Sequence, residues 1–348
     1  MGFLIDADAL IPLGWKPVFQ QQIPDHAEHL VPARITAVQR TGLTLAPELP
    51  GVREIPMAGK WFTLAPEERP TVGDWVMVDP AEQAIESILA RTSLLKRLNP
   101  AGEIQLIAAN VDIALLVTSC NADFNLARLE RYLSVVLEAG VQPIVVLTKI
   151  DLHDEHEQFI ESARSLGADI PVECVNALDP GTLDGVRAWC RQGQTLAMLG
   201  SSGVGKSTLL NGLMGEAVQA TKSIRETDAK GRHTTTHRSL HPLPSGAVML
   251  DSPGMREFQI TDAGSGVEST FRDIDALAQQ CKFNDCEHAS EPGCRVREAI
   301  EAGELEERRL HSYFKLVREE RYNTETTAER HARARQFGRM VKSHKRKR

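Results

Sequence analysis

The sequence predicts an α/β protein with several domains: a small β-barrel near the N-terminus, a parallel sheet with helices on both faces, and a helical C-terminal part. Three observations support this prediction. Short strands separated by Gly and Pro fill residues 31–98, strands alternate with helices from about residue 105, and three Cys and one His gather just after residue 280. The 348 residues are enough for two or three domains with their own cores.

The composition is typical of a globular protein without a membrane segment. Apolar residues make up 42% and charged residues 25% of the chain. No uninterrupted apolar run approaches the roughly 20 residues that cross a bilayer. The first ten residues include Asp6 and Asp8 and no basic residue, unlike a secretory signal. We therefore expect a cytoplasmic protein that does not bind membranes.

The charge is distributed unevenly along the chain. Residues 330–348 hold nine Lys and Arg and no acidic residue. Subtracting these nine charges from the net charge of −7 leaves −16 on the other 329 residues. A basic tail on an acidic body favours a polyanionic partner such as nucleic acid, while a solvated, disordered end is the alternative. The basic residues are Arg330, Arg333, Arg335, Arg339, Lys342, Lys345, Arg346, Lys347 and Arg348.

The predicted barrel occupies residues 31–98 and follows an N-terminal arm of residues 1–30. Its expected strands are Ala33–Val38, Leu43–Leu45, Trp75–Val78 and Ala84–Leu89. The pattern does not define the type of barrel. Three cations at its end, Arg91, Lys96 and Arg97, belong either to an RNA-binding face or to a solvated strand edge.

The predicted parallel sheet lies within residues 99–275, and a helical region with the basic tail occupies residues 276–348. Alternation of buried strands and amphipathic helices is typical of such a sheet, which carries its ligand loops at the carboxyl ends of the strands. The expected strands are Ile113–Thr118, Pro143–Thr148, 171–175, Thr195–Leu199 and Val248–Asp251. The expected helices are Leu126–Ala139, a segment near 155–165, another near 183–190, and Lys206–Leu213.

A phosphate-binding loop connects the strand Thr195–Leu199 to the helix that follows it. The loop matches G-x-x-x-x-G-K-[ST] in full, and this strand-to-helix context is the one that the motif requires. Its backbone N–H groups would hold phosphates at the helix N-terminus, Lys206 would pair with the β- and γ-phosphates, and Ser207 would ligate Mg²⁺. The residues of this loop and of the helix start are Gly200, Ser201, Ser202, Gly203, Val204, Gly205, Lys206, Ser207 and Thr208.

Thr148-Lys149-Ile150-Asp151, at the end of another strand, is a guanine-recognition motif. Asp151 can accept two hydrogen bonds from guanine that adenine cannot supply, and Lys149 would pack over the base. A site built on such bonds can reject the wrong base by roughly 10⁴-fold. Thr148 replaces the commoner Asn, which would weaken base affinity modestly. Asn176 and Ala177, after the next strand, are candidates for a second base loop.

A third motif, Asp251-Ser252-Pro253-Gly254, ends the last predicted strand. Asp251 would hold Mg²⁺ through water, and Gly254 would sense the γ-phosphate. Upstream, the polar stretch Gly231–Thr236 offers a switch threonine, and the pattern does not decide between Thr234 and Thr235.

Met255 follows Gly254, at the place where many GTPases carry the Gln that orients the attacking water. Met cannot orient water, so intrinsic hydrolysis should be slow. His233 is the candidate within the chain for this role, and a purely structural switch histidine is the alternative.

The order of these three motifs is unusual. In an ordinary GTPase the phosphate loop comes first, Asp-x-x-Gly second and the guanine motif last. Here the guanine motif precedes both others. The chain therefore resembles a circularly permuted GTPase that binds GTP and GDP.

Cys281, Cys286, His288 and Cys294 lie within 14 residues. Three thiolates and one imidazole can complete a tetrahedral structural Zn²⁺ site and leave no open position for catalysis. Disulfides fit poorly with a cytosolic protein.

Together these motifs resemble those of the RsgA (YjeQ/YloQ-type) small ribosomal subunit biogenesis GTPases, over nearly the whole chain. Leu13-Gly14-Trp15, Val72–Val76 and Ile107–Asp112 also resemble motifs of that family. The resemblance implies an N-terminal OB-type barrel, a circularly permuted GTPase domain and a C-terminal zinc domain. It also implies a protein that binds the small ribosomal subunit and its rRNA late in maturation, and whose hydrolysis the subunit stimulates. We expect this protein to be a monomer. A hydrophobic residue such as Met255 in place of the catalytic Gln is a trait of this family.

Two rival functions stay open at this point: a P-loop ATPase acting on nucleic acid, and an RNA-binding checkpoint module that uses GTP only as a state marker. The motif order adds a hypothesis about coupling. The segment that would sense the γ-phosphate directly precedes the Cys/His region in the sequence. Whether GTP or GDP is bound could therefore set the orientation of the RNA-binding C-terminal end.

Overall fold

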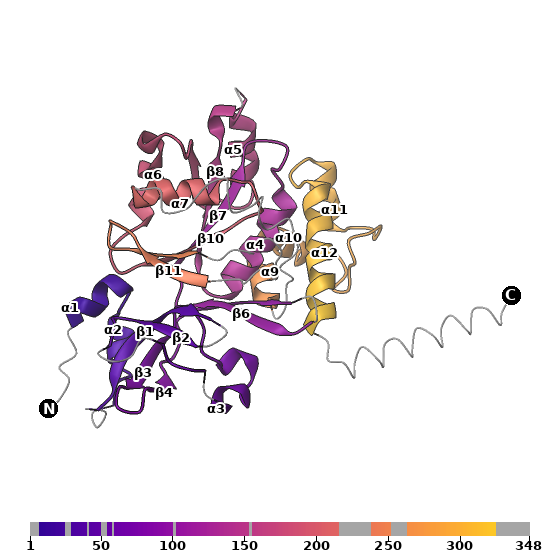
Figure 1. Ribbon diagram of the computed structural model, residues 1–348. Coiled ribbons are helices and arrows are strands. Elements are labelled where there is room, and N and C mark those ends of the chain that lie inside the picture. Colours follow the sequence, from indigo (N-terminus) through magenta and orange to yellow (C-terminus); the bar gives the residue numbers. More distant parts are fainter. Residues whose placement is uncertain are drawn as a thin grey trace, which may run out of the picture.

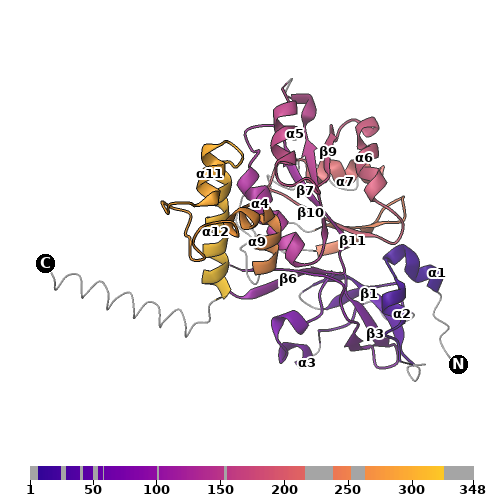
Figure 2. The same ribbon diagram turned by 180° about the vertical axis from the view of Figure 1, so that it is seen from behind.

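The structure is a computed structural model that describes residues 7–24, 29–39, 42–49, 54–57, 59–99, 102–152, 155–215, 238–251 and 263–324. Its layers are visible in Figure 1: N-terminal strands at the bottom, the helix-covered sheet above them, and the C-terminal helices along one side. Figure 2 shows the same arrangement from behind.

One large sheet runs through the molecule in the order β4-β3-β1-β11-β12-β10-β7-β8-β9, with β2 paired to β1. Strands β12, β10, β7, β8 and β9 are parallel, and β11 is antiparallel to β12. The strands of this half are β7 (Ile113–Ser119), β8 (Gln142–Thr148), β9 (Val172–Val175), β10 (Thr195–Leu199), β11 (Arg238–Pro242) and β12 (Val248–Asp251). The sequence predicted all of them except β11.

Helices cover both faces of the parallel strands, as predicted. Alternate residues of β7 face opposite cores: Leu116 packs in the cluster with α4, and Leu115 packs in the cluster with α7. The helices are α4 (Leu126–Glu138), α5 (Glu157–Arg164), α6 (Asp184–Trp189) and α7 (Lys206–Met214). The side chain of Asn125 caps α4 by accepting the backbone N–H of Arg128 at 2.9 Å.

The N-terminal strands are β1 (Val31–Val38), β2 (Leu43–Ala46), β3 (Trp75–Asp79) and β4 (Ala84–Ile88). They pair antiparallel around a buried core that includes Ile35, Val76 and Trp61. Strand β1 also pairs with β11, so these strands and the parallel sheet form one continuous ladder. Among the described residues the pairing order is β4-β3-β1-β2, and an OB-type barrel stays a prediction.

A separate hairpin of β5 (Leu94–Leu98) and β6 (Ile104–Ala109) connects the two halves. The sequence did not predict it, and it crosses the expected domain limit between residues 98 and 99. Short helical segments complete the connections. They are α1 (Ala7–Leu10), η1 (Ile11–Leu13), α2 (Pro17–Gln20), α3 (Gly59–Phe62), η2 (Pro66–Glu68), η3 (Ile150–Leu152) and η4 (Pro180–Leu183).

The C-terminal part is helical, as predicted, and packs against α4. Its helices are α9 (Gly264–Thr270), α10 (Arg272–Ala278), α11 (Arg295–Glu301) and α12 (Glu307–Thr324). At Gly266 of α9, an added Cβ would lie 1.9 Å from the carbonyl oxygen of Ser134 in α4, so only glycine permits this approach. Within the described ranges, no helix is both long enough and apolar enough to span a bilayer.

The cations predicted at the end of the barrel have partners within the protein. The Arg91 guanidinium contacts both carboxylate oxygens of the buried Asp74, at 2.7 Å each. Lys96 forms an ion pair with Glu67 at 3.6 Å, and Arg97 donates to Gln105 at 3.0 Å. This geometry favours the structural alternative for Arg91, since its side chain already holds the fold together.

Candidate functional site

The parallel strands bring the predicted nucleotide motifs to one edge of the sheet. Strand β8 ends at Thr148, β9 at Val175, β10 at Leu199 and β12 at Asp251. Because the carboxyl ends of parallel strands meet at the same edge, the loops that follow them lie side by side. Motifs separated by about 100 residues in sequence are thus gathered there.

The phosphate loop has a formed shape in this structure. An added Cβ at Gly200 would lie 2.3 Å from the carbonyl oxygen of Val117, so the loop can leave β10 in this direction only with glycine. The Lys206 ammonium donates to the carbonyl oxygens of Gly200 at 2.7 Å and Ser201 at 2.6 Å. Ser207 and Thr208 stand in the first turn of α7, where helix N–H groups attract anions.

Thr148 links the guanine motif to the phosphate loop. Its side chain is fully buried, and its hydroxyl lies 3.1 Å from the carbonyl oxygen of Thr118 and within hydrogen-bond distance of that of Val204. Sequence reasoning treated Thr148 only as a weaker substitute for Asn. The structure shows that its short hydroxyl joins the ends of β7 and β8 to the phosphate loop.

The rest of the base motif follows at the surface. Lys149 adopts a left-handed backbone with φ of 58°, which turns the chain into η3, where Asp151 is exposed. After β9, the Asn176 side chain accepts the N–H of Leu178 at 3.0 Å, and its carbonyl accepts the N–H of Asp179 at 2.8 Å. This closed turn, which includes Ala177, packs beside α7.

Several predicted residues cannot be placed. Asp251 closes β12, at the same edge as the other motifs, but its side chain is outside the description. His233, Thr234, Thr235, Gly254 and Met255 lie outside the described residues.

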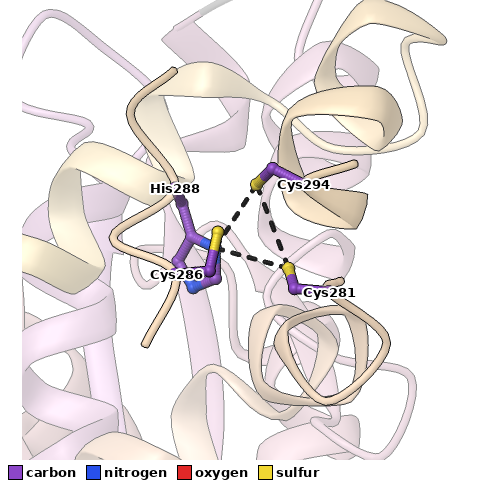
Figure 3. A group of neighbouring side chains, drawn as sticks. All are labelled: Cys281, Cys286, His288 and Cys294. Atoms are coloured by element: carbon purple, nitrogen blue, oxygen red, sulfur yellow. Dashed lines mark hydrogen bonds between the residues drawn. The ribbon is translucent and has the colours of Figure 1, made fainter. Parts of the chain in front are cut away.

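The predicted metal ligands come together. The ligand atoms of Cys281, Cys286, His288 and Cys294 all lie within 4.8 Å of one another (Figure 3). His288 Nδ1 is 3.6 Å from the Cys281 sulfur and 3.4 Å from that of Cys294, and these two sulfurs are 4.0 Å apart. A tetrahedral zinc site requires about 3.8 Å between sulfurs and about 3.5 Å from sulfur to nitrogen. The four residues therefore fit a tetrahedral metal.

The local fold explains this convergence. Cys281 follows the end of α10, and Cys294 is the N-cap of α11, where its sulfur accepts the N–H of Arg297 at 3.5 Å. Burial opposes ionisation of Cys281, but backbone N–H groups of Val296 and Arg295 favour its thiolate, and the net effect lowers its pKa. Burial lowers the pKa of His288, which favours the neutral imidazole that binds metals.

Sequence reasoning missed one residue at the phosphate loop. Arg128, in the first turn of α4, donates from Nη1 to the Ser201 hydroxyl at 2.9 Å. No motif marks it, because the contact depends on which helix lies beside the loop in the folded protein.

Comparisons with known proteins agree with this geometry. A family model described as RsgA GTPase matches residues 88–261. "Small ribosomal subunit biogenesis GTPase RsgA 2" of Vibrio vulnificus is 49% identical over 338 residues, covering 96% of this chain and 94% of that protein. "Small ribosomal subunit biogenesis GTPase RsgA" of Mesorhizobium japonicum is 44% identical over 323 residues, covering 91% of each chain.

Two solved structures have a similar fold. YjeQ from Thermotoga maritima superposes with a TM-score of 0.61 at 26% identity, covering 83% of this chain and 97% of that one. YloQ, described as a circularly permuted GTPase, gives a TM-score of 0.57 at 24% identity over 87% of this chain and 99% of that one, and shows the fold alone. The parallel strand order, the phosphate loop downstream of the guanine motif and these matches lead to one conclusion: the chain is a GTP hydrolase that belongs to the RsgA GTPase family.

Proposed function

We propose that this GTPase acts in the maturation of the small ribosomal subunit in the cytoplasm, and that it binds the subunit through rRNA. The observation that carries the proposal is a formed phosphate loop, tied by Thr148 to the guanine motif, in a chain 49% identical to a relative named for small-subunit biogenesis. The basic tail, residues 330–348, supports a polyanionic partner, although it lies outside the described residues.

The nucleotide would lie along the carboxyl edge of the sheet. Asp151 and Lys149 would hold the guanine, with Asn176 and Ala177 on its other side. The phosphate loop, Gly200 to Thr208, would hold the phosphates through its backbone N–H groups and Lys206.

Magnesium would be held by Ser207, Asp251 and one switch threonine, Thr234 or Thr235. The bound ion would neutralise charge on the β- and γ-phosphates. Gly254 would sense the γ-phosphate through its backbone N–H.

The residue after Gly254 is Met255, which has no group that can orient water. We propose that the attacking water is positioned by His233 together with the ribosomal partner, so that turnover is slow in the free protein. The Cys/His cluster would hold one structural Zn²⁺, since the four ligands Cys281, Cys286, His288 and Cys294 complete a tetrahedron.

The deciding experiment measures GTP and ATP hydrolysis with and without purified small subunits. We expect GTP turnover to be low alone and to rise many-fold with subunits, and ATP turnover to stay at background. Equal GTP turnover with and without subunits would contradict the proposal. Preferential ATP turnover would instead support an ATPase that acts on nucleic acid.

A matched variant tests the base site. Xanthine carries a carbonyl oxygen where guanine carries its amino group, and the amide of Asn can donate to that oxygen. Asp151→Asn should therefore lose affinity for GTP and gain affinity for xanthosine triphosphate, as measured in a nucleotide competition assay. If Asp151→Asn kept its preference for GTP, Asp151 would not be the base-reading residue.

Two further measurements separate enzyme from checkpoint and test the tail. Single-turnover hydrolysis on the subunit should be fast in an enzyme; GTP that is bound but not cleaved there would favour a checkpoint module.

Deleting residues 330–348 should weaken subunit binding and flatten its dependence on salt, because fewer counterions are then released. Unchanged binding would remove the tail from the proposal.

A further inference from the structure

The Arg128 side chain extends from α4 to the phosphate loop. Its backbone N–H is bound by the N-cap residue Asn125, which fixes the first turn of the helix. Its Nη1 donates to the Ser201 hydroxyl at 2.9 Å and lies 3.4 Å from the carbonyl oxygen of Asp123. The guanidinium therefore bridges the loop after β7 and the loop after β10.

Ser201 is held from two sides by cations. Its hydroxyl accepts from Arg128, and its carbonyl oxygen accepts from the Lys206 ammonium at 2.6 Å. Lys206 is the residue that the proposed site assigns to the β- and γ-phosphates. Arg128 therefore contacts one of the two residues, Ser201 and Gly200, whose carbonyl oxygens accept from the phosphate-binding lysine.

A purely local role does not explain this arginine. A cation in the first turn of a helix is opposed by the helix dipole, which favours anions there. Within the part of the chain that the structure describes, no carboxylate lies within ion-pair distance of the Arg128 guanidinium. Among the described residues, the structure places only neutral oxygens in contact with this guanidinium, those of Ser201 and Asp123, and an anionic ligand would stabilise such an arrangement.

We infer that Arg128 is a positioning residue for the nucleotide triphosphate: by holding Ser201 it keeps Lys206 aligned, and its charge favours GTP over GDP. The inference rests on the proposed nucleotide site. It requires no ribosomal partner, because it concerns nucleotide affinity in the free protein. A failure to respond to small subunits would therefore leave it standing.

The test is a double-mutant cycle between Arg128→Gln and Ser201→Ala, read as dissociation constants for GTP and GDP. Breaking a charge-assisted hydrogen bond should weaken GTP binding by roughly 10-fold. Because the second change removes a contact that is already lost, the double variant should bind GTP about as well as Arg128→Gln alone. GDP affinity should fall less than GTP affinity, since GDP carries less negative charge.

Controls separate positioning from folding. Arg191→Gln removes an exposed guanidinium that donates to the carbonyl oxygen of Ala188, away from the phosphate loop, and it should leave both dissociation constants unchanged. Arg128→Lys keeps the charge with less reach, and it should retain part of the preference for GTP. All variants should unfold at the wild-type temperature.

Three results would overturn the inference. The first is wild-type GTP affinity in Arg128→Gln. The second is additive losses in the double variant, which would mean that Arg128 does not act through Ser201. The third is a fall in unfolding temperature that accounts for the whole loss of binding, which would make Arg128 a structural residue.

Discussion

The N-terminal strands and the C-terminal helices each attach to the GTPase domain through one interface. These two interfaces, the N-terminal joint and the C-terminal joint, consist of different contacts. The N-terminal joint combines a short backbone ladder with side-chain bonds, among them an ion pair between Lys16 of the arm and Asp112, which precedes β7. Strand β1 pairs with β11 through Ala37↔Ser239 and Val38↔Arg238. Beside this ladder the buried Arg34 donates to the carbonyl oxygens of Gly73 at 3.2 Å and Asn110 at 3.4 Å, and also to that of Leu13 in the arm.

The C-terminal joint uses charged side chains. Glu130 of α4 is fully buried and accepts from Arg308 and Arg309 of α12, each at 3.1 Å. Arg309 also binds Asp273 of α10 at 2.6 Å. A second ion pair joins Arg131 to Glu319. Figures 1 and 2 both show α12 beside α4, along the side of the domain.

This difference between the two joints predicts which of the attached parts moves when GTP replaces GDP. A rotation of the C-terminal helices would have to separate buried charges, and it would also break the close contact between α9 and α4. A shift of the N-terminal strands would disturb a ladder of two residue pairs, which lies next to the predicted switch segment that precedes β11, together with the Arg34 hydrogen bonds and the partly exposed ion pair of Lys16 with Asp112. We therefore expect the N-terminal strands to respond to nucleotide more readily, contrary to the hypothesis drawn from motif order.

The largest expected effect is the loss of a metal ligand. Cys294→Ser should abolish stoichiometric zinc and unfold the segment around α11, because structural zinc supplies on the order of 10 kcal/mol to a small unit. Metal analysis and limited proteolysis measure both outcomes. The control is Cys174→Ser, a half-buried thiol outside the cluster, which should keep the zinc. A Cys294→Ser protein with full zinc content would show that the cluster is not the metal site.

The next effect concerns the charged joint. Glu130→Gln keeps the shape of the side chain but leaves Arg309 buried with one carboxylate fewer, which should cost about 3–5 kcal/mol in unfolding free energy. Glu319→Gln is the matched control: its pair with Arg131 is about one-fifth exposed on each side and should cost about 1 kcal/mol or less. Denaturant unfolding measures both values. Equal losses would mean that burial does not distinguish the two pairs.

Features that a short sequence segment determines could be predicted, whereas features that depend on contacts between distant residues could not. The strands Thr195–Leu199 and Val248–Asp251 have the predicted limits, because buried parallel strands are continuous apolar runs. The Cys/His cluster was predictable from spacing, since its four ligands lie on one short segment. By contrast, β11 is short and mostly polar, and its pairing with β1 joins residues about 200 positions apart.

The nucleotide edge shows the same limit. The three motifs predicted the phosphate and base loops, whose positions in the fold are as expected from strand order. The contacts of Thr148 with Val204 and of Arg128 with Ser201 could not be predicted, because each joins two loops that meet only after the sheet has formed.

A smaller effect is expected at the N-terminal joint. Arg34→Met leaves carbonyl oxygens without a donor, but it also removes a charge whose burial is costly, as its pKa shows: burial lowers the pKa of Arg34 to about 10. The two effects offset each other, so the net loss should be about 2 kcal/mol, less than for Glu130→Gln. Denaturant unfolding of both variants under one condition gives the comparison. A larger loss for Arg34→Met would reverse the proposed difference between the joints.

The smallest expected effect is a change in amide hydrogen exchange, and this measurement shows directly which of the two joints responds to nucleotide. Amide hydrogen exchange can be compared between GTP-analogue and GDP complexes of the full-length protein. We expect a change of roughly a few-fold in exchange at β1 and β11, because the ladder between them has two residue pairs and lies next to a predicted switch segment. Amides of α12 should exchange alike in both complexes, since the ion pairs of the buried Glu130 with Arg308 and Arg309 hold that helix against α4 in either state. If exchange changed in α12 and not in β1, the charged joint would be the one that responds to nucleotide, and the motif order would then describe the path of coupling.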